Sequence, residues 1–286
     1  MTEATRRAPG SPCWVSLMAH GLDATMDFYG GLFGWEFHPG PQQLGPYVRA
    51  LIDGKEVAGV GRLPADPRFR VAWTPYLATP DVDRTAETLR CCGGTVGVGP
   101  LDAEDAGRLA IVTDTAGSVF GLWQAAGHLG IAARGTHGTP VWSELVTAET
   151  AAVVKFYRSV FGYQESRDPD PGSVPGADPV PVPGTDVDRG HDGADGSGDG
   201  GQGDYVTLVR DGVPVAGLRG VGKALPRDRG SHWVTWFEVD DVDTAAERVV
   251  ELGGRVVDPP RSAARGRRAT VADPEGAVFT LVRSAR

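Results

Sequence analysis

A carboxylate within an apolar strand is the clearest candidate for proton chemistry in this sequence. Glu144 lies in the stretch "PVWSELV", two residues after Trp142. In apolar surroundings such a side chain can serve as a general base or acid, or it can hold a hydroxyl or amine of a ligand. No part of the chain predicts a nucleophile with its base, a phosphate-binding loop or a nucleotide fingerprint. We therefore expect no redox cofactor of the protein's own.

The cysteines and histidines do not have the spacing of a metal site. Cys91 and Cys92 are adjacent and Cys13 stands far from them, which matches no zinc motif. The six histidines fall mainly in predicted loops. A short basic turn is interpreted as a solvated loop rather than a binding site. This turn contains Arg265, Arg267 and Arg268.

Aromatic side chains recur at alternate positions of the predicted strands. Because strand side chains alternate between faces, Trp14 shares a face with Ser16, whereas Leu17 points to an opposite, apolar face that would pack on helices. Rings on one face of a curved sheet predict a slot for a planar apolar ligand, although they would also suit the filled centre of a barrel. The residues predicted to line this ligand-binding face are Trp14, Ser16, Thr74, Tyr76, Trp123, Trp142, Glu144, Val234, Trp236 and Thr280.

These residues occupy matching positions in an internal duplication. Residues 12–35 ("PCWVSL…MDFYGGLFGW") return at 140–163 ("PVWSEL…VKFYRSVFGY"), and the stretch 73–94 returns at 233–254. A repeat of this length indicates a duplicated domain rather than a solenoid, whose periods are far shorter. We therefore expect a flexible N-terminus (1–10), a first domain (11–126), a linker (127–138) and a second domain (139–286).

Each copy divides again into two modules, in which a strand precedes one helix and three further strands. Asp23 and Asp81 occupy the positions of helix N-caps, and glycines follow both helices where left-handed residues belong. This plan, repeated four times, predicts an α+β fold of two tandem domains with helices on one sheet face. In the first copy we expect helices at 23–33 and 83–92 and strands at 13–18, 57–60, 71–78, 109–112 and 118–123.

Composition argues against nucleic acid and membrane partners. The net charge of −9 comes mainly from residues 168–204, which hold nine Asp and one Arg among Gly, Pro and Ser. Such a segment cannot offset its ordering entropy by burial, so we expect a disordered acidic insertion, either a tolerated loop or a lid. The rest of the chain carries about −1, which gives no field to attract nucleic acid. A polar N-terminus and the lack of any apolar run of about 20 residues predict a cytoplasmic protein with no membrane span.

The motifs of the repeat resemble those of a known family. "DFYGGLFGW" and "KFYRSVFGY" match an "FY…LG" helix, "DTAGSVFGL" and "DPEGAVFTL" match a final strand, and "VDDVDTAAERVVELGG" matches the helix of an even module. In these features the chain resembles the vicinal oxygen chelate superfamily, which includes glyoxalases, bleomycin-resistance proteins and extradiol dioxygenases. The resemblance covers nearly all of the chain except the insertion and the first dozen residues. It implies cupped mixed sheets built from paired βαβββ modules, with the ligand on the concave face and helices on the convex face.

The resemblance also indicates where a metal would lie, and the residues found there are unsuited to one. Most enzymes of this superfamily hold a divalent metal through His or Glu on first strands and Glu on final strands. A divalent cation needs several such donors, and a shift of the alignment by one residue brings none. We therefore expect no metal and no cofactor in either domain. The positions concerned are Trp14, Thr74, Gly121, Trp142, Val234 and Thr280.

The resemblance favours a metal-free binding protein over an enzyme. Duplicated, metal-free relatives in actinobacteria accompany antibiotic pathways, and this chain looks most similar to those of aromatic polyketide, anthracycline-type (daunorubicin–doxorubicin) pathways. Such a protein, as a monomer or homodimer, would sequester or present a planar aromatic intermediate and assist a tailoring oxygenase such as a cytochrome P450. Two alternatives stay open. One is a cofactor-free isomerase, cyclase or oxygenase with Glu144 as general base, and the other is a metal-dependent dioxygenase or lyase with relocated ligands.

Overall fold

The computed structural model describes residues 7–42, 45–64, 66, 69–166, 204–263 and 265–285. The predicted insertion at 168–204, apart from Asp204, and the first six residues of the predicted N-terminus lie outside this part of the chain.

The first half contains β1 (Pro12–Ala19), α1 (Leu22–Phe33), β2 (Glu36–Pro39), β3 (Tyr47–Ile52), β4 (Lys55–Arg62), β5 (Ala72–Ala78), α2 (Val82–Cys91), β6 (Thr95–Ala103), η1 (Glu104–Ala106), β7 (Gly107–Thr113) and β8 (Val119–Ala125). The second half contains β9 (Pro140–Thr147), α3 (Thr150–Phe161), β10 (Gln164–Ser166), β11 (Tyr205–Arg210), β12 (Val213–Gly220), η2 (Gly222–Ala224), β13 (His232–Glu238), α4 (Val242–Glu251), β14 (Arg255–Ala263), β15 (Gly266–Ala272) and β16 (Val278–Ser284).

Each half folds into one eight-stranded mixed sheet. The strand order is β2-β3-β4-β1-β5-β8-β7-β6 in the first half, and the second half repeats it as β10-β11-β12-β9-β13-β16-β15-β14. The opening strands of the two modules pair antiparallel at the centre of each sheet, and each pairs parallel with the last strand of its own module. The predicted α+β class, with two tandem halves of two βαβββ modules each, is confirmed.

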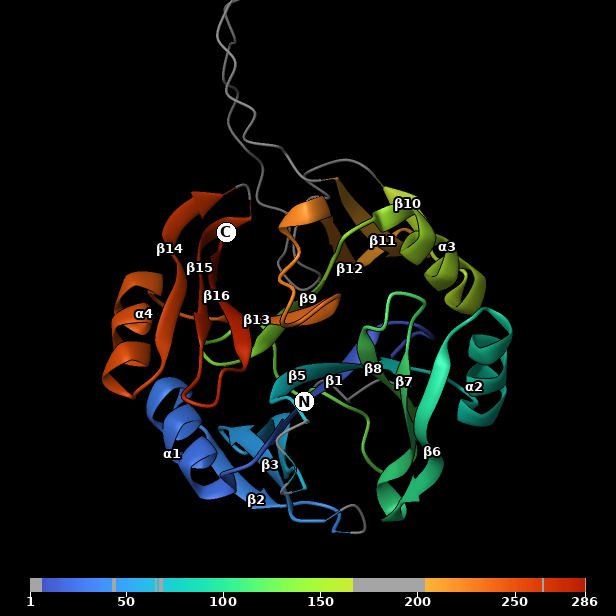
Figure 1. The fold of residues 1–286 in the computed structure, drawn as a ribbon. Coiled ribbons are helices and arrows are strands. Elements are labelled where there is room, and N and C mark those ends of the chain that lie inside the picture. Colours follow the sequence, from blue (N-terminus) through green and yellow to red (C-terminus); the bar gives the residue numbers. More distant parts are fainter. Residues whose placement is uncertain are drawn as a thin grey trace, which may run out of the picture.

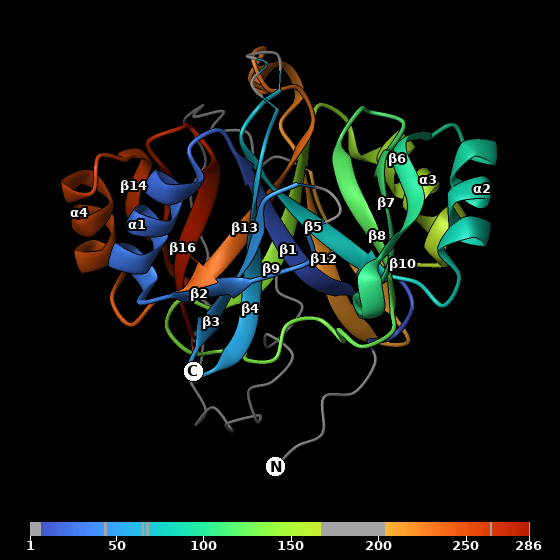
Figure 2. The same ribbon diagram turned by 90° about the horizontal axis from the view of Figure 1, so that it is seen from below.

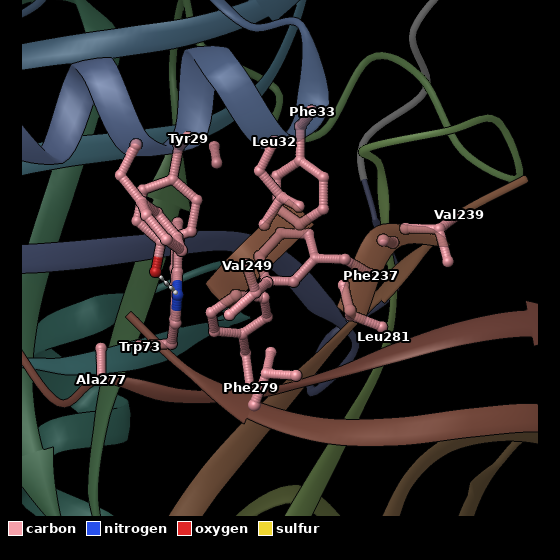
Figure 3. Close-up of a cluster of buried hydrophobic side chains, with 14 of the residues drawn as sticks. Tyr29, Leu32, Phe33, Trp73, Phe237, Val239, Val249, Ala277, Phe279 and Leu281 are labelled. Atoms are coloured by element: carbon pink, nitrogen blue, oxygen red, sulfur yellow. Dashed lines mark hydrogen bonds between the residues drawn. The ribbon is translucent and has the colours of Figure 1, made fainter. Parts of the chain in front are cut away.

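The two sheets share the cores beneath their helices. α1 lies beside α4 and α2 beside α3, so that each pair of helices combines both halves (Figures 1 and 2). In the core under α1 and α4, Phe237 of β13 packs against Phe33 and Trp73 of the first half, with ring centres 5.0 Å apart in both cases (Figure 3). Neither half therefore encloses its helix-side core by itself. The reason is that the apolar faces of β5 and β13 meet at the centre of the molecule.

A tyrosine from each "FY" motif is joined to an aspartate of the opposite half. Tyr29 donates a hydrogen bond to Asp273 Oδ2 at 3.1 Å. It also accepts one from Trp73 Nε1 at 2.9 Å, which Figure 3 shows. In the other core, Tyr157 donates to Asp114 Oδ2 at 3.2 Å. Burial raises the pKa of both tyrosines far enough that their hydroxyl groups stay protonated and act as donors. The two motifs thus form buried polar links between the halves.

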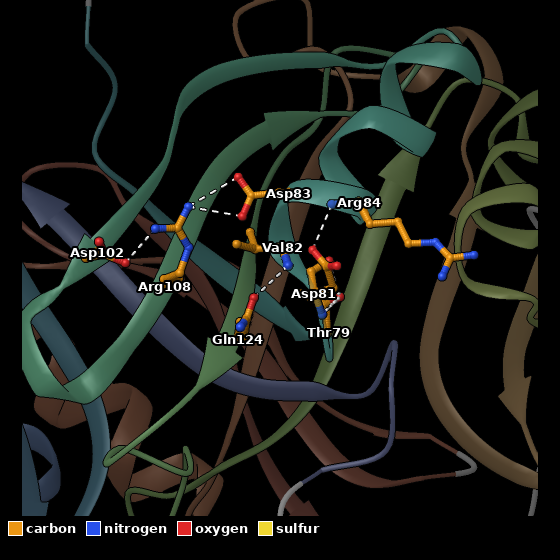
Figure 4. Close-up of polar contacts among 8 residues, drawn as sticks. All are labelled: Thr79, Asp81, Val82, Asp83, Arg84, Asp102, Arg108 and Gln124. Atoms are coloured by element: carbon orange, nitrogen blue, oxygen red, sulfur yellow. Dashed lines mark hydrogen bonds and ion pairs between the residues drawn. The ribbon is translucent and has the colours of Figure 1, made fainter.

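The α-helices are short, and aspartate side chains cap the N-termini of α2 and α4. The α-helices of the described chain span 10 to 12 residues, and none of them is long and apolar enough to cross a membrane. Asp81 caps α2 as predicted, because its Oδ1 accepts a hydrogen bond from Arg84 N at 2.9 Å. Figure 4 shows a second acceptor at this end, since Gln124 Oε1 accepts from Val82 N at 2.9 Å.

The start of α1 differs from the prediction. Its N-cap is Gly21 rather than Asp23, which lies within the first turn. Glu275 of the second half supplies the missing acceptors, because its carboxylate accepts from the backbone N–H groups of His20 at 2.8 Å and Gly21 at 2.7 Å. A negative charge at this end also complements the helix dipole. The cap therefore adds another contact between the halves.

Candidate functional site

The residues predicted to bind a ligand lie on the helix-free faces of the two sheets, in two separate places. Figure 1 shows that helices cover only one face of each sheet. We call the opposite, concave face of the first sheet, which carries Trp14 and Tyr76, the first cup. The concave face of the second sheet, which carries Trp142 and Trp236, is the second cup. The first cup holds Trp14, Ser16, Thr74, Tyr76 and Trp123. The second cup holds Trp142, Glu144, Val234, Trp236 and Thr280. The five predicted rings are thus divided between two cups and do not form one slot.

The first cup is filled by the protein's own side chains. Trp14 Nε1 donates to Tyr47 OH at 2.9 Å, and the same hydroxyl is hydrogen-bonded to Ser16 Oγ at 2.7 Å. His128, from the predicted linker, lies edge-on to Trp14 and Trp123, with ring centres 4.4 and 5.6 Å away. Trp14 is consequently only 4% exposed. For this cup the geometry favours rings that fill the centre of a barrel.

Glu56 holds His128 in this position. Its Oε2 lies 2.8 Å from His128 Nδ1, and its Oε1 accepts a hydrogen bond from Arg49 at 2.6 Å. These two partners, His128 above all, lower the pKa of Glu56 from its ordinary 4.5 to about 2. The linker backbone is fixed as well, since Ile131 N donates to Cys13 O at 2.8 Å. The linker thus closes the first cup through the contact between His128 and Glu56 and through a backbone hydrogen bond.

Replacing Glu56 by glutamine is expected to lower the free energy of unfolding at neutral pH by about 1 kcal/mol, a small value because the carboxylate is partly exposed. The folded pKa of about 2 lies below the ordinary 4.5, so the stabilisation is complete above pH 4.5 and is lost as the pH falls towards 2. Urea unfolding of both proteins from pH 7 downwards measures the difference. The exposed Glu247, replaced by glutamine, is the control. If the difference in the free energy of unfolding between wild type and Glu56→Gln stays constant down to strongly acidic pH, the lowered pKa of Glu56 is contradicted.

A cavity of about 430 Å³ adjoins the first cup at the side of the linker. Cys13, Trp123 and Leu129 belong to its lining, whereas Trp14 and Tyr76 do not. Burial raises the pKa of the Cys13 thiol to about 12, so this side chain is a neutral thiol. The cavity therefore reaches Trp123 but neither Trp14 nor Tyr76, and it offers no reactive thiolate.

The second cup has the same strand framework and different contents. Trp142 of β9 pairs with Trp236 of β13, so that both side chains lie at directly opposite positions of the concave face. Two residues along the strand, Glu144 pairs with Val234 on one side and with Gly217 on the other. Trp142, Trp236 and Glu144 are buried, with at most 6% of each exposed.

Arginine side chains cover the two indole rings. The guanidinium carbon of Arg265 lies 4.3 Å from the ring centre of Trp142, and that of Arg268 lies 5.2 Å from the ring centre of Trp236. These are cation–π distances. The solvated-loop interpretation is therefore wrong for both arginines. For Arg268 the reason is the alternation of side chains along β15, which places this residue on the concave face. The adjacent Arg267 lies on the opposite face, where it pairs with Asp243 of α4.

Glu144 lies in a polar environment that is only partly satisfied. Its Oε1 is 2.9 Å from Arg219 Nε, whereas its Oε2 has no hydrogen-bond partner among the described residues. Trp236 Nε1 and Thr207 Oγ1 are also buried and without a partner there. Burial, and secondly the charge of Glu144, raises the pKa of Tyr205 to about 12, so this phenol is protonated. Buried polar atoms without partners are rare and costly, which makes this cup the stronger candidate for a ligand site.

Four side chains of the second cup are missing from the site predicted from the sequence, namely Tyr205, Arg219, Arg265 and Arg268. The three arginines could be found from the sequence by comparing the two copies at every position of the concave face. The first copy has Gly61, Ala106 and Leu109 at the equivalent positions. Tyr205 has an equivalent tyrosine, Tyr47, and no difference between the copies points to it.

The positions that would hold a metal in this fold do not suit a divalent cation. Trp142, Val234 and Thr280 occupy them in the second cup, and Trp14, Thr74 and Gly121 in the first. None of these side chains is an imidazole or a carboxylate, and the described residues contain no group of three or more His, Cys, Asp and Glu that could hold a metal. Glu144 offers a single carboxylate and is paired with Arg219. No step proposed below involves a metal.

Proteins similar to this chain over nearly its whole length include antibiotic biosynthesis proteins. The anthracycline biosynthesis protein DauV of Streptomyces sp. (strain C5) is 33% identical, with 97% of this chain and 94% of DauV aligned. DnrV of Streptomyces peucetius, also named an anthracycline biosynthesis protein, shows the same identity and coverage. The putative glyoxylase CFP32 of Mycobacterium bovis is 30% identical, with 100% of this chain and 99% of CFP32 aligned.

Solved structures share the fold at low identity. The Mn(II)-bound glyoxalase from Novosphingobium aromaticivorans matches with a TM-score of 0.60 and 16% identity, covering 96% of this chain and 82% of that one. The 2,2',3-trihydroxybiphenyl 1,2-dioxygenase from Sphingomonas wittichii strain RW1 matches with a TM-score of 0.60 and 14% identity, covering 97% and 91%. At such identities the likeness concerns the fold alone. The model of the Glyoxalase/Bleomycin resistance protein/Dioxygenase superfamily matches residues 139–281, and together with the full-length relatives it shows that the chain belongs to this superfamily.

Proposed function

We propose that this protein binds a planar aromatic molecule in the second cup and serves as a metal-free accessory protein in anthracycline-type antibiotic biosynthesis. The observation that carries the proposal is that two buried indole rings, those of Trp142 and Trp236, are each covered by a guanidinium group. A guanidinium group is planar and stacks on a ring as a flat ligand would. Arg265 and Arg268 are partly exposed and have flexible side chains, so they can swing aside to admit a ring.

The two cups would then have different tasks. We assign Trp142, Glu144, Val234, Trp236 and Thr280 to ligand binding. The predicted residues of the first cup, namely Trp14, Ser16, Thr74, Tyr76 and Trp123, are assigned instead to a filled centre closed by the linker. This division follows from what covers the rings, because a histidine held by a carboxylate and a backbone-anchored linker close the first cup, and partly exposed arginines cover the second.

The names of the relatives support the pathway. DauV and DnrV are named anthracycline biosynthesis proteins and align with nearly the whole chain. An intermediate of such a pathway has fused planar rings, which suits two neighbouring indoles. By sequestering or presenting this intermediate, the protein would assist a tailoring oxygenase such as a cytochrome P450, and it could relieve product inhibition without chemistry of its own.

Glu144 supports a second candidate function. Its Oε2 is buried and free of partners among the described residues, so it could accept a proton from an acidic polyphenol. The protein would then be a cofactor-free isomerase, cyclase or oxygenase with Glu144 as general base. Arg219, at 2.9 Å, would hold the carboxylate in place in either case.

A titration with 9,10-anthraquinone and its hydroxylated derivatives is expected to quench tryptophan fluorescence to saturation, because the ligand ring would stack on Trp142 and Trp236. Chromatography of the ligand after incubation with the protein alone is expected to recover it unchanged. The bulky but non-planar decalin is the control and should not quench. Failure of every planar ligand to quench to saturation would contradict the proposal.

The variant Glu144→Gln separates the two functions. For an accessory protein, the wild type converts no ligand and the variant still binds. For an enzyme, the wild type converts the ligand, and the variant loses this conversion while fluorescence quenching survives.

A further inference from the structure

The second cup carries positive charge that no described residue neutralises. Arg219 is paired with Glu144, the carboxylate of the cup, at 2.9 Å. Arg265 and Arg268 form no ion pair with any residue in the described part of the chain, and Arg265 Nη2 is buried there without a hydrogen-bond partner. A buried or half-buried cation without a partner is costly, because burial removes the water that would solvate it.

The surroundings of Arg268 show the excess of charge directly. Burial lowers the pKa of this guanidinium group, and the positive charges of Arg261 and Arg219 lower it further, against the opposite effect of Glu144. Arginine nevertheless keeps its proton in proteins. The charge therefore stays in the cup and lowers the free energy of any anion that enters it.

The fold itself does not need these cations. The first cup is built on the same strand order, and the equivalents of the three arginines there are Gly61, Ala106 and Leu109. Arg49 of the first cup is paired with Glu56 at 2.6 Å. The same strand order thus forms with small or apolar side chains at these three positions, which supports a ligand-related role for the arginines of the second cup.

We propose that the ligand of the second cup is an aromatic anion, whose ring stacks on Trp142 and Trp236 and whose anionic oxygen is bound by Arg265 and Arg268. This inference rests on the function proposed above and specifies its ligand class: a planar ring system that carries a carboxylate or an ionised phenol. Guanidinium groups bind such oxygens through charge-assisted hydrogen bonds. Glu144 Oε2, which accepts only, suits a hydroxyl group elsewhere on the same ring system.

The test compares ligands that share one ring system and differ in charge. Wild-type protein is expected to bind anthraquinone-2-carboxylate about tenfold more tightly than the neutral anthraquinone-2-carboxamide, as measured by fluorescence titration. The preference should decrease as salt is added, because ions screen charge–charge attraction. A third ligand, 2-hydroxyanthraquinone, is titrated through its ionisation and shows whether an ionised phenol is bound as well as a carboxylate.

Two variants and one control assign the preference to residues. Arg265→Gln and Arg268→Gln are each expected to remove most of the preference for the carboxylate, measured as the ratio of the affinities of the same variant for the carboxylate and the amide. Arg267→Gln is the control, because Arg267 is adjacent on β15 and pairs with Asp243 on the opposite face at 2.6 Å. It should change neither affinity. Circular dichroism and thermal unfolding establish that each variant is folded.

The possible outcomes separate this inference from the proposed function. Equal binding of carboxylate and amide by the wild type would overturn the anion proposal and leave the binding function intact. Absence of quenching by both ligands would overturn the binding function. A preference for the carboxylate that persists in both Arg265→Gln and Arg268→Gln would overturn the assignment to these arginines.

Discussion

Replacement of Phe237 by alanine is expected to lower the free energy of unfolding by about 3–5 kcal/mol. The side chain is 0% exposed, and its ring lies 5.0 Å from those of Phe33 and Trp73 in the other half of the chain. Truncation removes these contacts and leaves a cavity where the halves meet, which the backbone can fill only in part. Equilibrium unfolding in urea, followed by circular dichroism, measures the change.

The control for this prediction is Phe69→Ala. Phe69 is 49% exposed, so the same change of side chain should cost less than about 0.5 kcal/mol. The shared cores also predict a single unfolding transition for the wild type, because neither sheet can lose its partner and keep its helix-side core. Two separate transitions, or equal losses for Phe237→Ala and Phe69→Ala, would contradict the packing described here.

The substitution Trp142→Leu is expected to weaken the binding of a planar aromatic ligand about thirtyfold, equivalent to about 2 kcal/mol. Leucine keeps the site apolar but removes the flat surface on which a ring would stack. Trp14→Leu, the equivalent change in the first cup, is expected to leave the affinity unchanged, because His128 already covers that ring. Fluorescence titration or calorimetry with one anthraquinone ligand compares the two variants.

Each variant serves as the control for the other. Trp14 and Trp142 are 4% and 6% exposed, so their replacement should cost similar amounts of folding stability and a general loss of structure would affect both. The two variants should therefore differ only in their affinity for the planar ligand. If Trp14→Leu weakens the affinity and Trp142→Leu does not, the ligand lies in the first cup and the assignment of the second cup is wrong.

Local patterns in the sequence were sufficient to predict the modules and the two faces of their strands. Alternation along β1 places Leu17 with the helices and Trp14 on the concave face, as the structure shows. Asp81 could be predicted as a helix cap because capping depends on neighbouring residues only. Resemblance to a family of known fold then predicted how modules pair within each sheet.

Contacts between distant parts of the chain could not be predicted in this way. The hydrogen bond from Tyr29 to Asp273 and the cap that Glu275 provides for α1 join residues of opposite halves, and no local pattern reports them. The closure of the first cup by His128 depends on the path of the linker. A basic turn by itself indicates a solvated loop, and the contact of Arg265 with the ring of Trp142 depends on the fold of the chain.

The interlocked cores have a consequence for how a duplicated protein changes over time. Mutations on the helix side of either sheet disturb both copies at once, since Tyr29 and Asp273 belong to different copies and stabilise the same interior. The concave sides are not coupled in this manner. One copy could therefore become a permanent scaffold while the other acquired new polar side chains, and selection for a different guest molecule would act on a single surface without endangering the fold.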